Sequence, residues 1–172
     1  MNEAKAPQIP TDKEGGVVKN VGDLASSLRK LSNTLRRAES EKSLAIMEAQ
    51  MVNHMVEIAR HMELVNEGKR KENVDVLVAS LLTLVKIMEG VGEVSKGINT
   101  KKLEGYRREI LKSLKNVEDR CLDFLSSIAP FKDLSGAIAG PLQKLISTIQ
   151  EKRHFLAKKL VDIPEVGVDP FA

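Results

Sequence analysis

The chain has 172 residues, enough for one domain with a sizeable core, and 3% of them are aromatic, with no Trp and one Tyr. This composition argues against a β-sandwich or β-barrel, whose strands are usually rich in aromatic and β-branched residues. The 27 basic and 24 acidic residues leave a formal net charge of +3, which does not require a nucleic-acid partner.

Residues 1–20 precede the first helical pattern and mix prolines, glycines and alternating charges without periodicity. Such a segment cannot bury enough apolar surface to order itself, so we predict a flexible N-terminal tail. It also contains no apolar run of the kind found in secretory signals, and the cytoplasm is therefore the expected location.

A long first helix is predicted over about residues 23–66. Its first half carries leucines in steps of four and three, a spacing typical of a coiled-coil seam. These residues are Leu24, Leu28, Leu31 and Leu35. An apolar stripe resumes after Ser40 and runs to a stop at Gly68, which suits the left-handed position after a helix. A helix of this extent would measure about 66 Å.

Residues 74–94 are the most apolar passage of the chain and raise the question of a membrane span. The passage contains Asp75 near its start and Lys86 and Glu89 further along, and each charge costs roughly 2.5 to 3.5 kcal/mol at the centre of a bilayer. We therefore expect no transmembrane segment, but a helix over about 73–96 that is covered around most of its circumference.

Three more helical segments are predicted toward the C-terminus. A clear amphipathic helix covers about residues 100–128 and ends before Pro130. A short helix over 133–139 follows, and the Gly140–Pro141 pair separates it from a last helix over 141–161.

Together these elements predict an all-α, up-and-down four-helix bundle with a long, partly coiled-coil-like first helix. The bundle covers residues 21–161, and an extended C-terminal tail covers 162–172. The first helix is about twice as long as the second, so its N-terminal half needs a cover from either a third helix of this chain or another molecule. We expect this half to project from the bundle or to pair outside it.

The function expected from this shape is a non-enzymatic scaffold or interaction subunit of a larger protein assembly, which binds a protein partner or a second copy of itself. The contacts are expected from the apolar residues of the projecting helix and of the tail. These residues are Leu24, Leu28, Leu31, Leu35, Val166, Val168 and Phe171.

No motif for catalysis, for a cofactor or for a metal is visible in the sequence. His54, Glu57 and His61 share one side of the first helix, but the two histidines are about 10.5 Å apart along its axis, too far to bind one ion. Cys121, the one cysteine, excludes an intramolecular disulfide and continues an apolar stripe, which predicts a buried core residue. We therefore expect no enzyme, no metal site and no cofactor.

An alternative function is the binding of nucleic acid or another anionic surface through a basic face of the third and fourth helices. The face would consist of Lys101, Arg108, Lys112, Lys115, Lys152, Arg153, Lys158 and Lys159. Two observations count against nucleic acid: the strips hold no aromatic residue on which a base would stack, and acidic residues interrupt the third helix.

Overall fold

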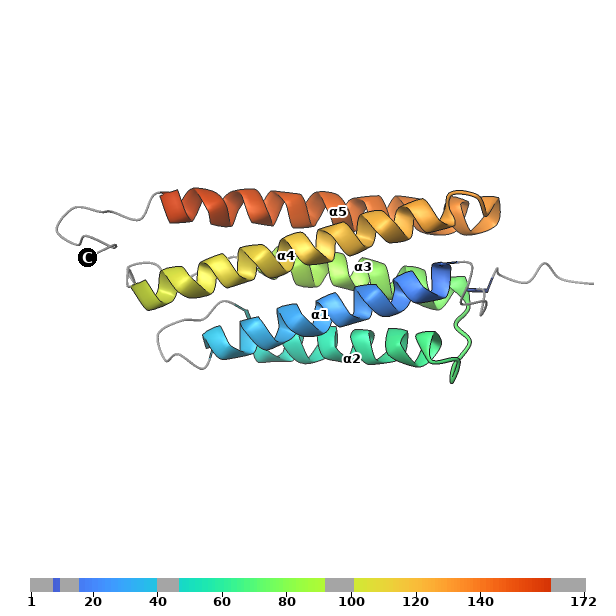
Figure 1. Cartoon of the computed structure of the whole chain (residues 1–172), viewed down its shortest axis with the longest axis horizontal. Coiled ribbons are helices and arrows are strands. Elements are labelled where there is room, and N and C mark those ends of the chain that lie inside the picture. The colour runs from blue at the N-terminus through green and yellow to red at the C-terminus, as the bar shows by residue number, and fades with distance from the viewer. Residues whose placement is uncertain (1–7, 10–15, 40–46, 92–100, 162–172) are drawn as a thin grey trace, which may run out of the picture.

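The computed structural model of the chain describes residues 8–9, 16–39, 47–91 and 101–161. These residues form five α-helices, drawn in Figure 1: α1 (Val17–Glu39), α2 (Ala49–Asn66), α3 (Val74–Gly90), α4 (Lys101–Ile128) and α5 (Lys132–Val161). The predicted all-α class is confirmed, but the predicted number of four main helices is not.

The long first helix predicted over 23–66 is instead the pair α1 and α2, which lie side by side and antiparallel. The sequence explains why one straight helix is unfavourable. The step from Ala38 to the next apolar residue, Leu44, is six, which moves the apolar stripe to another side of the helix axis. When the chain turns back instead, both stripes are buried in the same core.

Each helix runs opposite to the one before it, so that α1, α3 and α5 point one way and α2 and α4 the other (Figure 1). α1 packs against α2 and α4, and α5 packs against α4 and α3. Around the bundle the order is thus α2, α1, α4, α5, α3. The ring is weakly closed between α3 and α2, which contact each other sparsely.

The leucine stripe of α1 lies inside the bundle. Leu24, Leu28 and Leu31 are fully buried, and Leu35 is 1% exposed. No part of α1 projects beyond a covering helix, because α2 and α4 flank it on both sides. The intermolecular seam was expected because half of the first helix would be left uncovered. In the fold, that half is covered by helices of the same chain.

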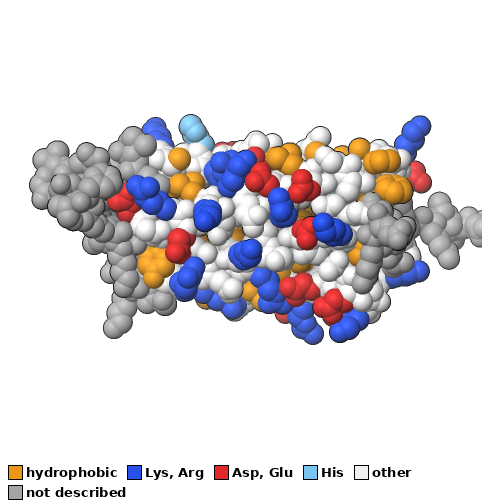
Figure 2. Space-filling model, in the orientation of Figure 1, with side chains coloured by type: hydrophobic (Ala, Val, Ile, Leu, Met, Phe, Trp, Pro, Cys, Tyr) orange, Lys and Arg blue, Asp and Glu red, His pale blue; other side chains and the backbone are white. Residues whose placement is uncertain are grey.

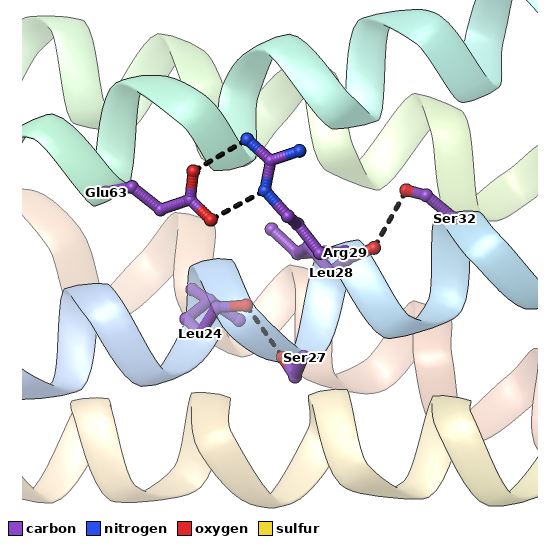
Figure 3. Close-up of polar contacts among 6 residues, drawn as sticks. All are labelled: Leu24, Ser27, Leu28, Arg29, Ser32 and Glu63. Atoms are coloured by element: carbon purple, nitrogen blue, oxygen red, sulfur yellow. Dashed lines mark hydrogen bonds and ion pairs between the residues drawn. The ribbon is translucent and has the colours of Figure 1, made fainter.

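Polar side chains of α1 are accommodated close to this stripe (Figure 3). The Ser27 hydroxyl donates to the Leu24 carbonyl oxygen at 2.7 Å, and Ser32 donates in the same way to Leu28 at 2.8 Å. Such bonds to the preceding turn allow a serine to be buried without an unpaired hydroxyl. Across the helix pair, Arg29 donates to both carboxylate oxygens of Glu63 on α2, at 2.6 and 2.7 Å.

Order begins earlier in the chain than the predicted tail of residues 1–20 implies. α1 starts at Val17, which is 1% exposed, and Ile9 is 2% exposed with its N–H bonded to the Glu72 carbonyl oxygen at 3.1 Å. The apolar residues of this segment that the structure describes, Ile9, Val17 and Val18, all lie in the core. The predicted tail at 162–172 lies outside the described residues.

α3 ends at Gly90, six residues before the predicted end at 96. The Asn73 side chain caps its start by accepting from the Asp75 N–H at 2.6 Å. Most of its large residues are buried, although Val76 and Leu82 are 44% and 41% exposed. Among the described residues, no helix has both the length and the hydropathy that crossing a membrane requires.

The two C-terminal helices predicted at 133–139 and 141–161 are one continuous helix, α5, with Pro141 inside it. Proline removes one hydrogen bond of the helix and usually kinks or ends it. Here, apolar residues on both sides of the proline point to the same core, so packing outweighs the lost bond. These residues are Leu134, Ile138, Leu142 and Leu145.

Candidate functional site: a basic groove between α1 and α4

An open groove of about 720 Å³ runs along the junction of α1 and α4. This junction lies on the face turned to the viewer in Figures 1 and 2, where Lys and Arg side chains gather with fewer Asp and Glu among them. Eight residues line the groove: Lys30, Asn33, Thr34, Arg36, Arg37, Glu109, Lys112 and Ser113.

Helix periodicity explains why α1 presents cations on this side. Lys30, Asn33 and Arg37 recur at steps of three and four on the side of α1 that faces away from the leucine stripe. α4 contributes Glu109, Lys112 and Ser113 from the turns that pack beside them. The antiparallel packing of two helices whose buried faces meet thus places two polar edges next to each other.

The charges in the groove are unbalanced, with four cations and a single carboxylate. Arg37 donates to Glu109 at 3.1 Å, in a pair whose side chains are 61% and 50% exposed. Lys30 and Lys112 have no carboxylate within ion-pair distance in the described part of the chain. An exposed pair such as Arg37–Glu109 contributes about 0 to 1 kcal/mol, so the groove keeps a positive potential available to a ligand.

Neutral polar groups form the base of the groove. Thr34 donates to the Lys30 carbonyl oxygen at 3.1 Å, and its hydroxyl lies 3.4 Å from that of Ser113 across the helix junction. Arg36, which also lines the groove, donates to the Asn53 side-chain oxygen on α2. The groove therefore offers hydroxyl and amide groups as well as charges.

The structure describes the side chains of six of the eight residues in the basic face predicted from the sequence. Three of its members are paired within the chain: Arg108 with Glu104 at 2.6 Å, Lys115 with Asp119 at 3.0 Å, and Arg153 with the buried Glu118. Lys152 and Lys158 lie on α5, away from the α1–α4 junction. The side chains of Lys101 and Lys159 are outside the described part.

Only Lys112 of the predicted face takes part in the groove. Its basic companions, Lys30, Arg36 and Arg37, come from α1, for which the leucine spacing had predicted a self-association seam. In the sequence, these residues form a charged strip opposite the leucine stripe. The strip does not predict the groove, because the helix that lies beside α1 depends on how the five helices are ordered around the bundle.

A buried arginine lies on α4 close to its N-terminal end. Arg107 is 6% exposed, and its Nε has no hydrogen-bond acceptor among the described residues. Burial lowers the pKa of Arg107 from its usual value, and the attraction of the Glu104 carboxylate partly offsets this effect. The guanidinium is therefore an incompletely satisfied charge at this end of the bundle.

Two of the histidines lie together on α2, and the cysteine lies in the core. His54, Glu57 and His61 line a second, smaller groove of about 290 Å³ between α2 and α3, where Arg70 lies 2.7 Å from His61 Nδ1. No cluster of three His, Cys, Asp or Glu side chains suited to a metal ion occurs there or elsewhere in the described ranges. Burial raises the pKa of the Cys121 thiol to about 12, so the thiol stays protonated near neutral pH.

The chain matches no protein-family model, no curated protein and no solved structure. The chemistry of the α1–α4 groove is therefore inferred from its own residues.

Proposed function

We propose that the chain is a non-enzymatic interaction subunit that binds an acidic segment of a protein partner in the α1–α4 groove. The observation that carries this proposal is the set of four groove cations opposed by one carboxylate, with Lys30 and Lys112 lacking an ion-pair partner in the described residues. Such a surface attracts anions from a distance and orients them on contact.

A peptide fits the groove chemistry better than a nucleic acid does. A peptide backbone carries both donors and acceptors, which suit Asn33, Ser113 and the Glu109 carboxylate, whereas a phosphate backbone offers acceptors alone. No aromatic side chain lines the groove, so it provides no platform for base stacking. These features favour the protein partner and leave nucleic acid as an outcome of the test.

The test compares two labelled probes, a polyglutamate peptide of about twelve residues and a single-stranded oligonucleotide of equal charge, by fluorescence anisotropy at low salt. We expect the peptide to bind and its affinity to fall between about 50 and 200 mM salt. The Lys30→Glu/Lys112→Glu variant should bind it about tenfold more weakly, since two attractive contacts become repulsive.

The matched control is Lys144→Glu/Lys158→Glu, which makes the same change of net charge at exposed positions of α5 outside the groove. It should change the affinity by less than about twofold, because exposed charges beyond a Debye length are screened. Equal losses in both variants would show a diffuse charge effect without a groove site. Tighter binding of the oligonucleotide, or no binding of either probe, would refute the proposal.

A further inference from the structure

We propose that the acidic C-terminal segment of this same chain, residues 162–172, folds back across α4 and occupies the α1–α4 groove in competition with a partner. The inference rests on the proposed function, because it assigns to the groove an internal ligand of the same chemical class. It gives the segment a different role from the apolar docking peptide expected from the sequence.

The first support is charge complementarity. Residues 162–172 contain Asp162, Glu165 and Asp169 and no Lys or Arg. The groove contains the opposite balance, four cations with one carboxylate. An acidic peptide tethered beside a basic groove is attracted to it more strongly than to the mixed charges of the remaining surface.

The second support is the position from which the segment leaves the bundle. α5 ends at Val161, at the same end of the molecule at which α1 ends and α4 begins (Figure 1). The groove is lined by the second half of α1 and the first half of α4, so it lies toward that end as well. The segment therefore starts near the groove and not at the opposite end of the bundle.

The third support is reach. Packed helices lie about 8 to 10 Å apart, so the way from α5 across α4 to its junction with α1 is about 15 to 20 Å. Eleven extended residues span up to about 36 Å. The segment is therefore long enough to cross α4 and to place Asp169 beside the groove cations.

The fourth support is Arg107, which lies level with the end of α5. The contact of Glu118 with Gln150 and Arg153 sets the register of the two helices. A helix rises 1.5 Å per residue, so Arg107 lies about 16 Å along α4 from this contact. Val161 lies about 12 to 16 Å along α5 from the same contact, and in the same direction because the two helices are antiparallel. The described part of α5 therefore ends level with a buried guanidinium whose Nε has no acceptor in the described residues. This cation is a suitable partner for the first acid of a segment that crosses α4.

A tethered segment competes efficiently even when each of its contacts is weak. A short flexible linker gives an effective concentration on the order of millimolar, so an intrinsic dissociation constant of about 0.1 mM already leaves the groove mostly occupied. The partner's acidic segment would then have to displace the internal one. Removing the acids of the internal segment should raise the affinity for an external ligand.

The experiment uses the full-length chain with the substitutions Asp162→Asn, Glu165→Gln and Asp169→Asn, and the polyglutamate probe at low salt. We expect the variant to bind the probe about five- to tenfold more tightly than the unaltered chain. The control is Glu57→Gln/Glu89→Gln/Glu151→Gln, which removes three exposed acids from α2, α3 and α5. It should leave the affinity within about twofold.

A second readout separates this inference from the proposed function. Neutralising the segment should shift the amide NMR signals of Thr34 and Ser113, which line the groove far from residues 162–172 in sequence, and the control variant should not. If both variants bind the probe equally and these signals do not move, the segment does not occupy the groove, although the groove remains a receptor. If the probe binds none of the chains but the signals shift, the segment occupies the groove and the proposed function is wrong.

Discussion

Glu118 places a buried carboxylate at the contact between α4 and α5. Its side chain is 5% exposed, and it accepts from Gln150 Nε2 at 3.0 Å and from Arg153 on α5. A buried carboxylate needs such partners, since removing it from water costs several kcal/mol. The two contacts therefore both compensate this cost and fix the register between the helices.

Replacing the arginine should expose this dependence. In Arg153→Met the aliphatic stem is kept and Glu118 loses its cationic partner, so the free energy of unfolding should fall by about 3 kcal/mol, the low end for a broken buried pair. The low end applies because the Arg153 side chain is 31% exposed, so water partly replaces it as a partner of Glu118 in the variant. Urea denaturation followed by circular dichroism measures the change.

The companion variant is Glu118→Leu/Arg153→Met, in which this buried pair is removed altogether. Replacement of both partners by apolar residues of similar volume is often neutral, so the double variant should recover to within about 1 kcal/mol of the unaltered chain. If the single variant were as stable as the unaltered chain, the pair would contribute no stability. An additive loss in the double variant would mean that the side-chain volumes matter and the charges do not.

At the scale of elements, the α1–α2 pair shows what periodicity reveals and what it leaves open. The leucine spacing of α1 predicted one shared apolar face and assigned it to a partner molecule, whereas in the fold the same leucines are buried by helices of their own chain. The shift after Ala38 marked a change of buried face. A change in the position of the apolar stripe is compatible with a bent helix, a broken helix or a turn. The stripe shows which face of a helix is buried, but it does not show in which direction the chain continues. The choice is made by the packing of α2 against α1, which sequence spacing does not contain.

The same element pair has a close contact that depends on a glycine. A Cβ built on Gly22 would lie 2.4 Å from Cγ and 2.8 Å from Cβ of Asn66, so α1 and α2 approach closely there only because the side chain is absent. Gly136 in α5 is the natural comparison, since no neighbouring group lies within 4 Å of the position that a Cβ would take there. The two glycines are both helical and differ in their surroundings.

Alanine at these two positions should therefore have opposite effects. Gly22→Ala should lower the free energy of unfolding by about 1 to 3 kcal/mol, since overpacking outweighs the gain in helix propensity. Gly136→Ala should raise it by about 0.4 to 1 kcal/mol by restricting the unfolded chain. Thermal unfolding of both variants gives the comparison, and adding Asn66→Ala to Gly22→Ala should restore part of the loss. Stabilisation by both alanines would contradict the close approach of α1 to α2.

At the scale of the whole molecule, the sequence predicted the composition of the core better than the composition of the surface. Apolar residues such as Leu114, Val117 and Ile149 are buried wherever a helix packs on the bundle, so spacing suffices to find them. A shared polar surface depends instead on which helices are neighbours. The predicted basic face joined α4 to α5, and the groove joins α4 to α1.

The order of the helices also decides whether the leucine stripe of α1 stabilises one molecule or an assembly. Leu31 is fully buried between the helices of its own chain. Leu31→Ala should therefore lower the free energy of unfolding by about 2 to 5 kcal/mol in a single chain. The loss should be the same at every protein concentration, because unfolding of one chain is a unimolecular process.

Urea denaturation at two protein concentrations about a hundredfold apart tests this point, with light scattering to report the mass at each. Equal midpoints at both concentrations, for the unaltered chain and for Leu31→Ala, are expected from the fold. A midpoint that rises with concentration and falls back in Leu31→Ala would mean that the stripe is shared between chains, since mass action stabilises only an associated state. In that case α1 would exchange its place between two molecules, and the α1–α4 groove would join two chains.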